Sequence, residues 1–401
     1  MNYRVQAVSI NAARAVYALN WFDIAPGLKY IAQSLDLQIV QLGIVTTGFY
    51  VGLASFQLFG GYFASRIGNR RTETIGLLIL GFSVMGSGIA PNLGILFLTR
   101  LLAGFGSAFF FSPALGMLAE IVPDEKYSFY VGAFNGSFNI GAAVGVLGWV
   151  YIDETLGWRI GLIIGGAMTV AMAIENYLVL RGVVVHTSRG RDLFTKVKTT
   201  LRERAMWILP IAGIGSMVSE TVMGQFFVYY AEQSLNFSPS LSGSLGFMFL
   251  IVGFLGGIIG GYQYGRTKHK NATFVSVLVL TGVLTMAIPF LSSPLSIAML
   301  AVLLGLVVVD GFSILYTIAA KLAPDKSMVS FSLSFVNFMQ QAIGATFPFI
   351  FTSIVYFSGY TTSWVVMGAI SFLSVILFPL AAGKHQRPVS GVAKVDFNIY
   401  K

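Results

Sequence analysis

Six charged side chains stand inside long apolar stretches of this chain: Arg14, Asp23, Arg100, Glu175, Glu220 and Asp310. An ionisable group in hydrocarbon is costly unless it faces a cavity or a partner, so each of them needs a reason to be there. The three histidines all fall in polar segments, and the chain has no cysteine. Any proton carrier within the apolar stretches is therefore a carboxylate, and chemistry that depends on a thiolate or a disulfide is excluded.

The acidic and basic groups suggest specific partners. Asp23 follows Asn20 by three residues, so on a continuous helix the two would share a face, which is a candidate cavity face. Arg14 would lie on roughly the opposite side of that helix, where it either reaches toward the membrane surface or binds a substrate. Arg100 needs a carboxylate, and Asp23 is the simplest one. Such a pair either couples transport to protons or is purely structural.

The elements that carry these residues are membrane helices. Hydrophobic residues make up 56% of the chain and charged residues only 10%. A spanning helix needs about 20 mainly apolar residues. Twelve such stretches are predicted, six in each half of the chain, and they begin near residues 5, 40, 74, 93, 128, 158, 206, 241, 272, 295, 328 and 360. The sequence therefore predicts an all-α protein that crosses the membrane many times.

The two halves repeat one another at an offset of 200 residues. Gly-Gly-Tyr at residues 60–62 recurs at 260–262, and Gln-Ser-Leu at 33–35 recurs at 233–235. Under this offset Glu220 is equivalent to Asn20. We expect two pseudo-symmetric six-helix bundles, residues 1–182 and 205–384, joined by a linker at 183–204 and followed by a tail at 385–401. Parallel repeats of this kind place a substrate path between the halves.

Basic residues predict the orientation. They gather in alternate connections: Arg4, Arg66, Arg70, Arg71, Lys126, the run from Arg181 to Arg204, Arg266, Lys268, Lys270 and Lys326. The opposite connections hold only Lys29 and Arg159. By the positive-inside rule we expect both termini in the cytoplasm. We also expect a multi-pass protein of the cell membrane. The net charge of +9 is explained in this way, without a nucleic-acid partner.

The segment from Gly61 to Arg70 resembles a motif of the major facilitator superfamily, found between its second and third helices. That motif has a glycine, an acid four residues later, and a closing basic group. Gly61, Arg66, Gly68 and Arg70 fit it. Two positions depart from it: Ser65 stands where the acid is expected, and Asn69 stands where the first basic residue of the closing group is expected. The resemblance implies that Gly61, Ser65, Arg66, Gly68 and Arg70 control the conformation. It also implies a weakened charge latch between the halves, for which Glu73 is a candidate substitute.

The resemblance covers the whole chain and implies further roles. Arg100 and Gly104 match the family's fourth-helix motif, whereas Val146 and Trp149 break the fifth-helix motif of its antiporters. Helices 1 and 4, and their counterparts 7 and 10, line the cavity in the family. We therefore expect Asp23, Glu220, Asp310 and Arg100 to couple transport to protons. A second set is expected to bind the substrate: Asn20, Arg14, Tyr17, Asn135, Asn139, Asn337 and Gln341.

The sequence favours a secondary transporter that moves a small organic metabolite, with two alternatives. Two buried arginines suit an organic anion, whereas three buried acids suit proton coupling. A drug/proton antiporter that exports amphiphilic compounds is the first alternative, and a channel or receptor on the same scaffold is the second. A membrane enzyme would need a nucleophile, metal ligands or a cofactor motif, and the sequence shows no phosphate-binding loop and no His or Cys cluster. We expect no cofactor, and as partners only a small-molecule substrate, protons or another coupling ion, and membrane lipids, with the protein acting as a monomer.

Overall fold

The computed structural model describes residues 2–182, 197–198, 200–323 and 329–379. These residues form helices and connections, without a strand among them. The first half contains α1 (Tyr3–Leu19), α2 (Leu28–Leu35), α3 (Ile39–Ile67), α4 (Asn69–Gly88), α5 (Leu93–Ala108), α6 (Phe111–Ile121), α7 (Asp124–Thr155) and α8 (Trp158–Val179). The second contains α10 (Arg204–Ala212), α11 (Ile214–Gln233), α12 (Pro239–Arg266), α13 (Lys270–Ala287), α14 (Pro294–Lys321), α15 (Val329–Gly344) and α16 (Phe347–Ser374).

These helices account for the twelve predicted crossings. Within the described ranges, nine helical stretches are long and apolar enough to span a membrane. One of them, residues 331–377, contains two crossings, because α16 bends sharply at Gly359, whose φ is 81°. The interrupted pair α1 and α2 forms another crossing, and α4 the last. The predicted fold class is therefore confirmed.

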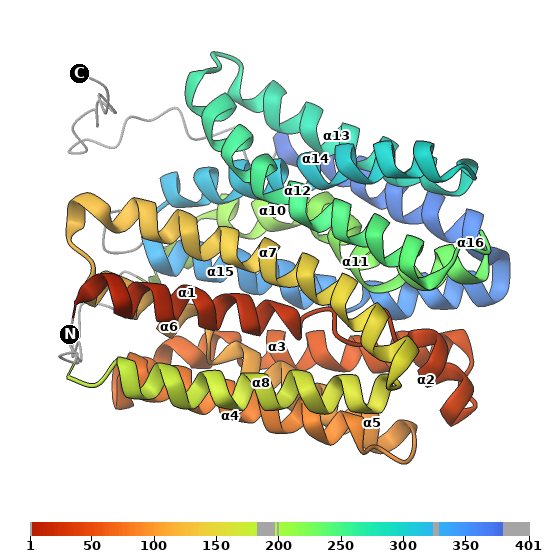
Figure 1. The fold of residues 1–401 in the computed structure, drawn as a ribbon. Helices are drawn as coiled ribbons and strands as arrows, with labels where there is room; N and C mark the ends of the chain where they lie inside the picture. The colour runs from red at the N-terminus through yellow and green to blue at the C-terminus, as the bar shows by residue number, and fades with distance from the viewer. Residues whose placement is uncertain (1, 183–196, 199, 324–328, 380–401) are drawn as a thin grey trace.

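The internal repeat is visible in the helix packing. Gly104 on α5 lies against the backbone carbonyl of Phe49 on α3, and Gly305 on α14 lies against the carbonyl of Phe249 on α12. A Cβ atom at either glycine would collide with that oxygen. Because small residues let membrane helices approach closely, both halves use the same device to join equivalent helices. Helices α1–α8 occupy one side of the molecule and α10–α16 the other (Figure 1).

The repeat also extends to the turns. Asp36 and Asn236, 200 residues apart, are the two residues other than glycine that have a positive φ within the described ranges, at 52° and 56°. Each lies two residues before the cap of the following helix, Gln38 for α3 and Ser238 for α12. Asp and Asn tolerate this left-handed conformation better than most residues. The same short turn therefore starts the second crossing of each half.

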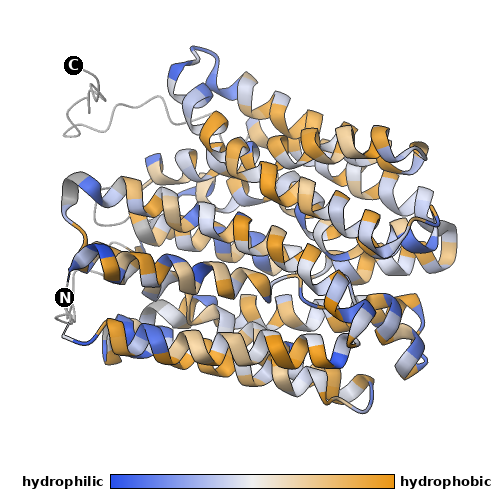
Figure 2. Cartoon of the chain, viewed as in Figure 1, coloured by the Kyte–Doolittle hydropathy of each residue, from blue (hydrophilic) through white to orange (hydrophobic). Residues whose placement is uncertain are grey.

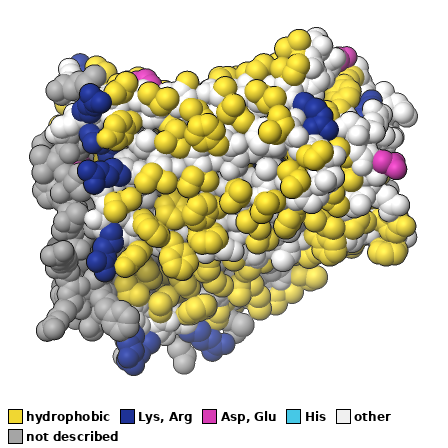
Figure 3. All heavy atoms as spheres, turned by 90° about the horizontal axis from the view of Figure 1, so that it is seen from below, with side chains coloured by type: hydrophobic (Ala, Val, Ile, Leu, Met, Phe, Trp, Pro, Cys, Tyr) yellow, Lys and Arg dark blue, Asp and Glu magenta, His cyan; other side chains and the backbone are white. Residues whose placement is uncertain are grey.

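Most of the molecular surface fits a lipid environment. Hydrophobic residues predominate along the helices, and hydrophilic residues gather at their ends (Figure 2). On the face seen in Figure 3, hydrophobic side chains cover the middle and most Lys and Arg side chains stand at one end. We call this end, which carries Arg66, Arg70, Arg71, Arg266 and Lys270, the basic end, and the opposite one the far end.

The first crossing is not the continuous helix that we expected. Helix α1 ends at Leu19, and turns occupy residues 20–27 before α2 begins. Pro26 and Gly27 disfavour helix at this point. The indole nitrogen of Trp149 donates a hydrogen bond of 2.8 Å to the carbonyl of Leu19, which would otherwise lack a partner at the broken end. The prediction that Asn20 and Asp23 share a helix face is therefore wrong.

The two halves meet at the far end. Lys29 on α2 forms an ion pair of 3.7 Å with Glu232 on α11. The hydroxyl groups of Tyr151 and Ser240 share a hydrogen bond of 3.0 Å. Gly43 also packs against Thr352. These contacts close the space between the halves on this side.

Two of the expected segments lie largely or wholly outside the described residues. These are the linker at 183–204, of which most lies outside, and the tail at 385–401, of which all lies outside. The boundaries assigned to the linker and tail therefore stay predictions.

Candidate functional site

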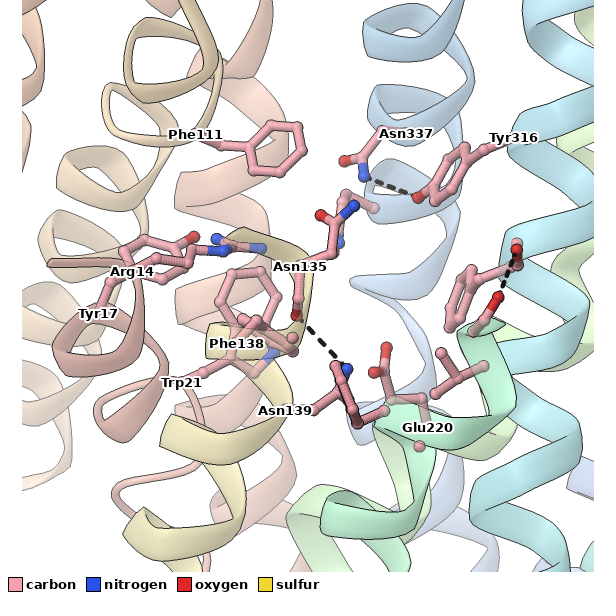
Figure 4. A pocket seen from close by; sticks show the side chains of 18 of the residues that line it. Arg14, Tyr17, Trp21, Phe111, Asn135, Phe138, Asn139, Glu220, Tyr316 and Asn337 are labelled. Atoms are coloured by element: carbon pink, nitrogen blue, oxygen red, sulfur yellow. Dashed lines mark hydrogen bonds between the residues drawn. The ribbon is translucent and has the colours of Figure 1, made fainter. Parts of the chain in front are cut away.

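A pocket of about 400 Å³ lies between the two halves (Figure 4). It is lined by α1, α3, α5, α6 and α7 from the first half and by α11, α12, α14 and α15 from the second. The cavity expected between the halves is therefore present, and its wall includes crossings 1, 4, 7 and 10. The second crossing of each half, α3 and α12, also contributes to the wall, as do α7 and α15. Its volume lies in the range of small-molecule sites, about 300–1,000 Å³.

The structure brings seven of the predicted site residues to the wall of this pocket: Arg14, Tyr17, Asn135, Asn139, Glu220, Asn337 and Gln341. They come from both halves. The amide of Asn139 donates to the backbone carbonyl of Asn135 at 3.5 Å. The buried Oε1 of Gln341 has no hydrogen-bond partner among the described residues. A buried acceptor without a partner is uncommon in folded proteins, and a water molecule or a ligand can satisfy it.

Four other predicted residues are not found among the residues that line the pocket: Asn20, Asp23, Arg100 and Asp310. Asn20 donates a hydrogen bond of 2.7 Å to Thr169 and so ties the broken end of α1 to α8. Asp310 is buried where α14 packs on α12 at Gly260, and its Oδ1 has no partner within the described part. The described residues contain no group of three His, Asp or Glu side chains that could hold a metal.

Asp23 and Arg100 form the ion pair that the sequence suggested. Arg100 on α5 donates from Nη1 and Nη2 to the two carboxylate oxygens of Asp23, at 2.9 and 2.8 Å. Both side chains are 1% exposed. A two-pronged contact between Arg and a carboxylate is short and directional, so this pair holds the interrupted first crossing against α5.

Aromatic rings surround the guanidinium of Arg14. Its carbon lies 4.5 Å from the ring centre of Phe138 and 4.9 Å from those of Tyr17, Phe111 and Phe134. Ring faces attract a cation, by about 2 kcal/mol or more where water is excluded. They supply no strong hydrogen-bond acceptor, and the Nε of Arg14 has none among the described residues. The cation is therefore stabilised but not neutralised.

A chain of hydrogen bonds crosses the pocket between the halves. Gln57 on α3 donates to the side-chain oxygen of Asn337 on α15, and Asn337 donates to the hydroxyl of Tyr316 on α14 at 2.8 Å. The Oε1 of Gln57 stays unpaired in the described structure. Gln57 and Tyr316 are not among the site residues predicted from the sequence. Gln57 does have a sequence signal, because it is a lone amide in the middle of an apolar stretch.

Another contact between the halves closes the pocket toward the far end. The amide of Gln225 on α11 donates to the backbone carbonyl of Trp21 and to the hydroxyl of Tyr50, both at 3.2 Å. Trp21 lies in the break after α1 and also lines the pocket. The broken first crossing therefore presents a free carbonyl to the second half, and Gln225 binds it.

The motif assigned to conformational control lies at the basic end. Gly68 joins α3 to α4 with a φ of 92°, a conformation that favours glycine. Arg66 lies 5.4 Å from the ring centre of Tyr62, and Arg70 donates to the carbonyl of Leu180 at 3.2 Å. The surroundings of Gly61 and of the Ser65 side chain lie outside the described part.

Glu73 does not lie where the proposed substitute latch requires it. Its side chain is 1% exposed and accepts a hydrogen bond from Asn176 on α8. Asn176 in turn accepts from Ser9 at 2.8 Å, as does Glu175. Glu73 is thus buried inside the first half, where it connects α4 to α8 and cannot bridge to the second. The suggestion that it replaces the missing acid is wrong.

Comparisons with known proteins agree with this architecture. The chain is 24% identical over 262 residues to a probable sugar efflux transporter of Helicobacter pylori, a match that spans 63% of this chain and 64% of that protein, less than two thirds of its length. It is 23% identical over 366 residues to an uncharacterized MFS-type transporter, YfnC, of Bacillus subtilis, covering 89% of this chain and 88% of that one.

A solved structure has the same fold. It is a bacterial homolog of the human lysosomal transporter Spinster in an inward-facing and occupied conformation, with a TM-score of 0.79 at 14% identity over 95% of this chain and 97% of that one. The sequence profile of the Major Facilitator Superfamily matches residues 10–348 and also 211–396, which together cover nearly the whole chain. These relatives are transporters and not enzymes, and the chain belongs to the Major Facilitator Superfamily.

Proposed function

We propose that this protein moves a small organic solute across the cell membrane by alternating access, and that it draws on a proton gradient. The observation that carries the proposal is the pocket between the halves, in which polar side chains from both halves converge. Repeated halves that share a central site can open it to one side and then to the other. The packing of the equivalent glycines, Gly104 and Gly305, against α3 and α12 supports a rigid unit in each half.

The coupling site that we propose uses carboxylates buried among the helices. Asp23 lies within the break in the first crossing and is held by Arg100, and Glu220 and Asp310 are the candidates in the second half. Protonation of Asp23 would remove one charge of its pair and release the interrupted segment from α5. A proton bound there would thereby favour one arrangement of the halves over the other.

The proposed orientation places both termini in the cytoplasm. The basic end carries clustered Lys and Arg side chains, which the positive-inside rule assigns to the cytoplasmic side. With this orientation the contacts at the far end, including Lys29 with Glu232, close the pocket on the outer side. The structure would then represent an arrangement that is closed to the outside.

Export of amphiphilic compounds is the second candidate function. Its support is the aromatic wall of the pocket, formed by Tyr17, Trp21, Phe111, Phe138 and Phe312. Flat apolar surfaces of this kind accept many ligands. Metabolite transport predicts binding of one narrow chemical class, whereas drug export predicts similar binding of unrelated amphiphiles.

A thermal-shift screen of the purified protein tests the proposal. A ligand that binds the folded state raises its apparent stability. Metabolites and amphiphilic drugs are compared at two pH values, with Arg14→Gln as a pocket variant and Arg159→Gln as a control outside the pocket. The proposal predicts stabilisation that Arg14→Gln weakens and Arg159→Gln leaves unchanged. Stabilisation that is equal in all three proteins would contradict a substrate site in this pocket.

A further inference from the structure

Two opposite charges face the same pocket from different halves. Arg14 comes from α1 and Glu220 from α11, and Figure 4 shows them on opposite sides of the cavity. The ion pairs found within the described ranges are Lys29 with Glu232 and Arg100 with Asp23, so neither Arg14 nor Glu220 is paired there. The pocket therefore presents a separated positive and negative group, whose formal charges sum to zero.

Arg14 is held in place for an anionic group. Arg14 is 8% exposed, and the centres of four aromatic rings lie 4.5 to 4.9 Å from its guanidinium carbon. A guanidinium has five N–H donors and no acceptor, so rings alone leave its hydrogen bonds unmade. Its buried Nε has no acceptor among the described residues. A ligand carboxylate would supply the missing acceptor and the missing charge.

Glu220 faces the pocket because the second half departs from the repeat at this position. Its counterpart Asn20 holds α1 to α8 by hydrogen bonds to Thr169 and Gly165. In α11 the neighbouring Ser219 joins the helix to others of its half, through hydrogen bonds of 2.7 Å to Thr285 on α13 and 3.5 Å to Ser371 on α16, the counterpart of α8. Glu220 is thus not needed to join helices, and its carboxylate is free to contact a ligand.

We propose that the pocket binds a zwitterion, with a carboxylate at Arg14 and an ammonium group at Glu220. This inference rests on the proposed function and specifies its substrate class. A simple anion would leave Glu220 without a partner, and a simple cation would leave Arg14 without one. An unpaired charge in a desolvated site opposes binding, so the pocket selects against both.

The remaining wall suits the body of such a ligand. Trp21, Phe138 and Phe312 give it an apolar surface. Gln57 and Gln341 also line it, and their amide oxygens have no hydrogen-bond partner among the described residues. These groups fit an amphiphilic zwitterion of amino-acid type with an apolar side chain. In this proposal Glu220 contacts the substrate, and Asp23 or Asp310 binds the proton that couples transport to the gradient.

A matched series of probes tests the charge requirement. Phenylalanine carries both charges, N-acetylphenylalanine only the carboxylate, phenylalanine amide only the ammonium, and N-acetylphenylalanine amide neither. The same four forms of leucine and tryptophan cover smaller and larger bodies. Binding to the purified protein is measured by thermal shift and calorimetry. We expect the zwitterion in at least one series to bind about tenfold or more tightly than its singly charged forms, because a blocked group leaves a polar partner unpaired.

Variants identify which charge meets which group. In Glu220→Gln, the zwitterion and its N-acetyl form should bind with nearly equal affinity, because the partner of the ammonium group is gone. In Arg14→Gln, the zwitterion and its amide form should bind with nearly equal affinity, because the partner of the carboxylate is gone. Each variant keeps binding of one singly charged probe, which shows that it is folded. Glu154→Gln removes an exposed acid outside the pocket and should leave both ratios unchanged.

Two results would overturn the zwitterion proposal: equal binding of a singly charged form, or no binding by any of the three zwitterions. The proposed function is judged separately, by uptake into liposomes of whichever compound stabilises the protein. Gradient-driven uptake of a simple anion or cation would reject the zwitterion and keep the transporter. A ligand that binds and is never moved would reject the transporter.

Discussion

Arg100 and Asp23 are joined by two hydrogen bonds of 2.9 and 2.8 Å, in a place where both side chains are 1% exposed. Asp23 lies in the break that separates α1 from α2, whereas Arg100 lies within α5. The pair therefore fixes the one irregular segment of the first crossing to a regular helix. A buried pair in such a position affects both stability and coupling.

Removal of one partner should destabilise the protein more than removal of both. Asp23→Asn or Arg100→Gln leaves a buried charge uncompensated, at a cost of about 3–5 kcal/mol. The double variant leaves none, and thermal unfolding in detergent should show it to be more stable than either single variant. In liposomes the double variant should equilibrate a substrate across the membrane without pH-driven accumulation. A double variant that still accumulates substrate would exclude this pair from coupling.

Gly104 should tolerate no side chain. A Cβ atom there meets the carbonyl of Phe49, so Gly104→Ala forces α5 away from α3 and costs about 1–3 kcal/mol or more. Gly148 on α7 is the matched control, because its Cβ position has nothing within 4 Å. Gly148→Ala should leave stability unchanged or raise it by about 0.5–1 kcal/mol. Similar melting temperatures for the two variants would contradict the close packing of α3 and α5.

Glu73 should prove to be a structural residue. Glu73→Gln keeps an acceptor for Asn176, and we expect it to remain within about 1 kcal/mol of the parent, because one amide oxygen suffices for this bond. Glu73→Leu removes the acceptor and should cost about 1–3 kcal/mol. Thermal unfolding of the two variants measures the difference. If the Glu73→Leu variant is as stable as the Glu73→Gln variant, the buried contact with Asn176 contributes nothing to the stability of the protein.

The ion pair between Lys29 and Glu232 should favour closure of the far end. At 3.7 Å, with Lys29 32% exposed, it is worth about 0–1 kcal/mol, enough to shift a balanced equilibrium several-fold. Lys29→Met should lengthen spin-label distances between cysteines placed at Gln33 and Thr361. The chain has no cysteine of its own, so these labels are specific. Lys268→Met, at the basic end, serves as the control and should leave the distances unchanged. An unchanged distance in Lys29→Met would mean that other contacts hold this end closed.

The sequence predicted the crossings and much of the pocket because their signals are local. Apolar stretches mark helices, and amides such as Asn135 and Asn337 stand out within them. The repeat also placed Glu220 on a cavity-lining helix. The different roles of Asn20 and Glu220 could not be predicted, since they depend on whether Thr169 or a pocket lies opposite.

Contacts assembled from several helices were beyond sequence reasoning. The rings around Arg14 come from α1, α6 and α7, and their convergence depends on the crossing angles of those helices. The latch role of Glu73 was predicted wrongly for the same reason, because its partner Asn176 lies on a helix distant in sequence. The break after Leu19 did have a local signal, Pro26 with Gly27, and apolar neighbours on both sides hid it.

The most direct test of the account is transport by purified protein in liposomes under an imposed pH gradient. A compound that stabilises the protein in the thermal-shift screen is followed as it enters the vesicles, with parent protein, Arg14→Gln and Arg159→Gln compared at equal amounts. We predict saturable accumulation above the equilibrium level in the parent and in Arg159→Gln, and loss of this accumulation when the gradient is collapsed. In Arg14→Gln the initial rate should fall at least tenfold, which is about the effect of losing one hydrogen bond to a charged group. Uptake that never exceeds equilibrium under the gradient, or that is unaffected by Arg14→Gln, would contradict gradient-driven transport through this pocket.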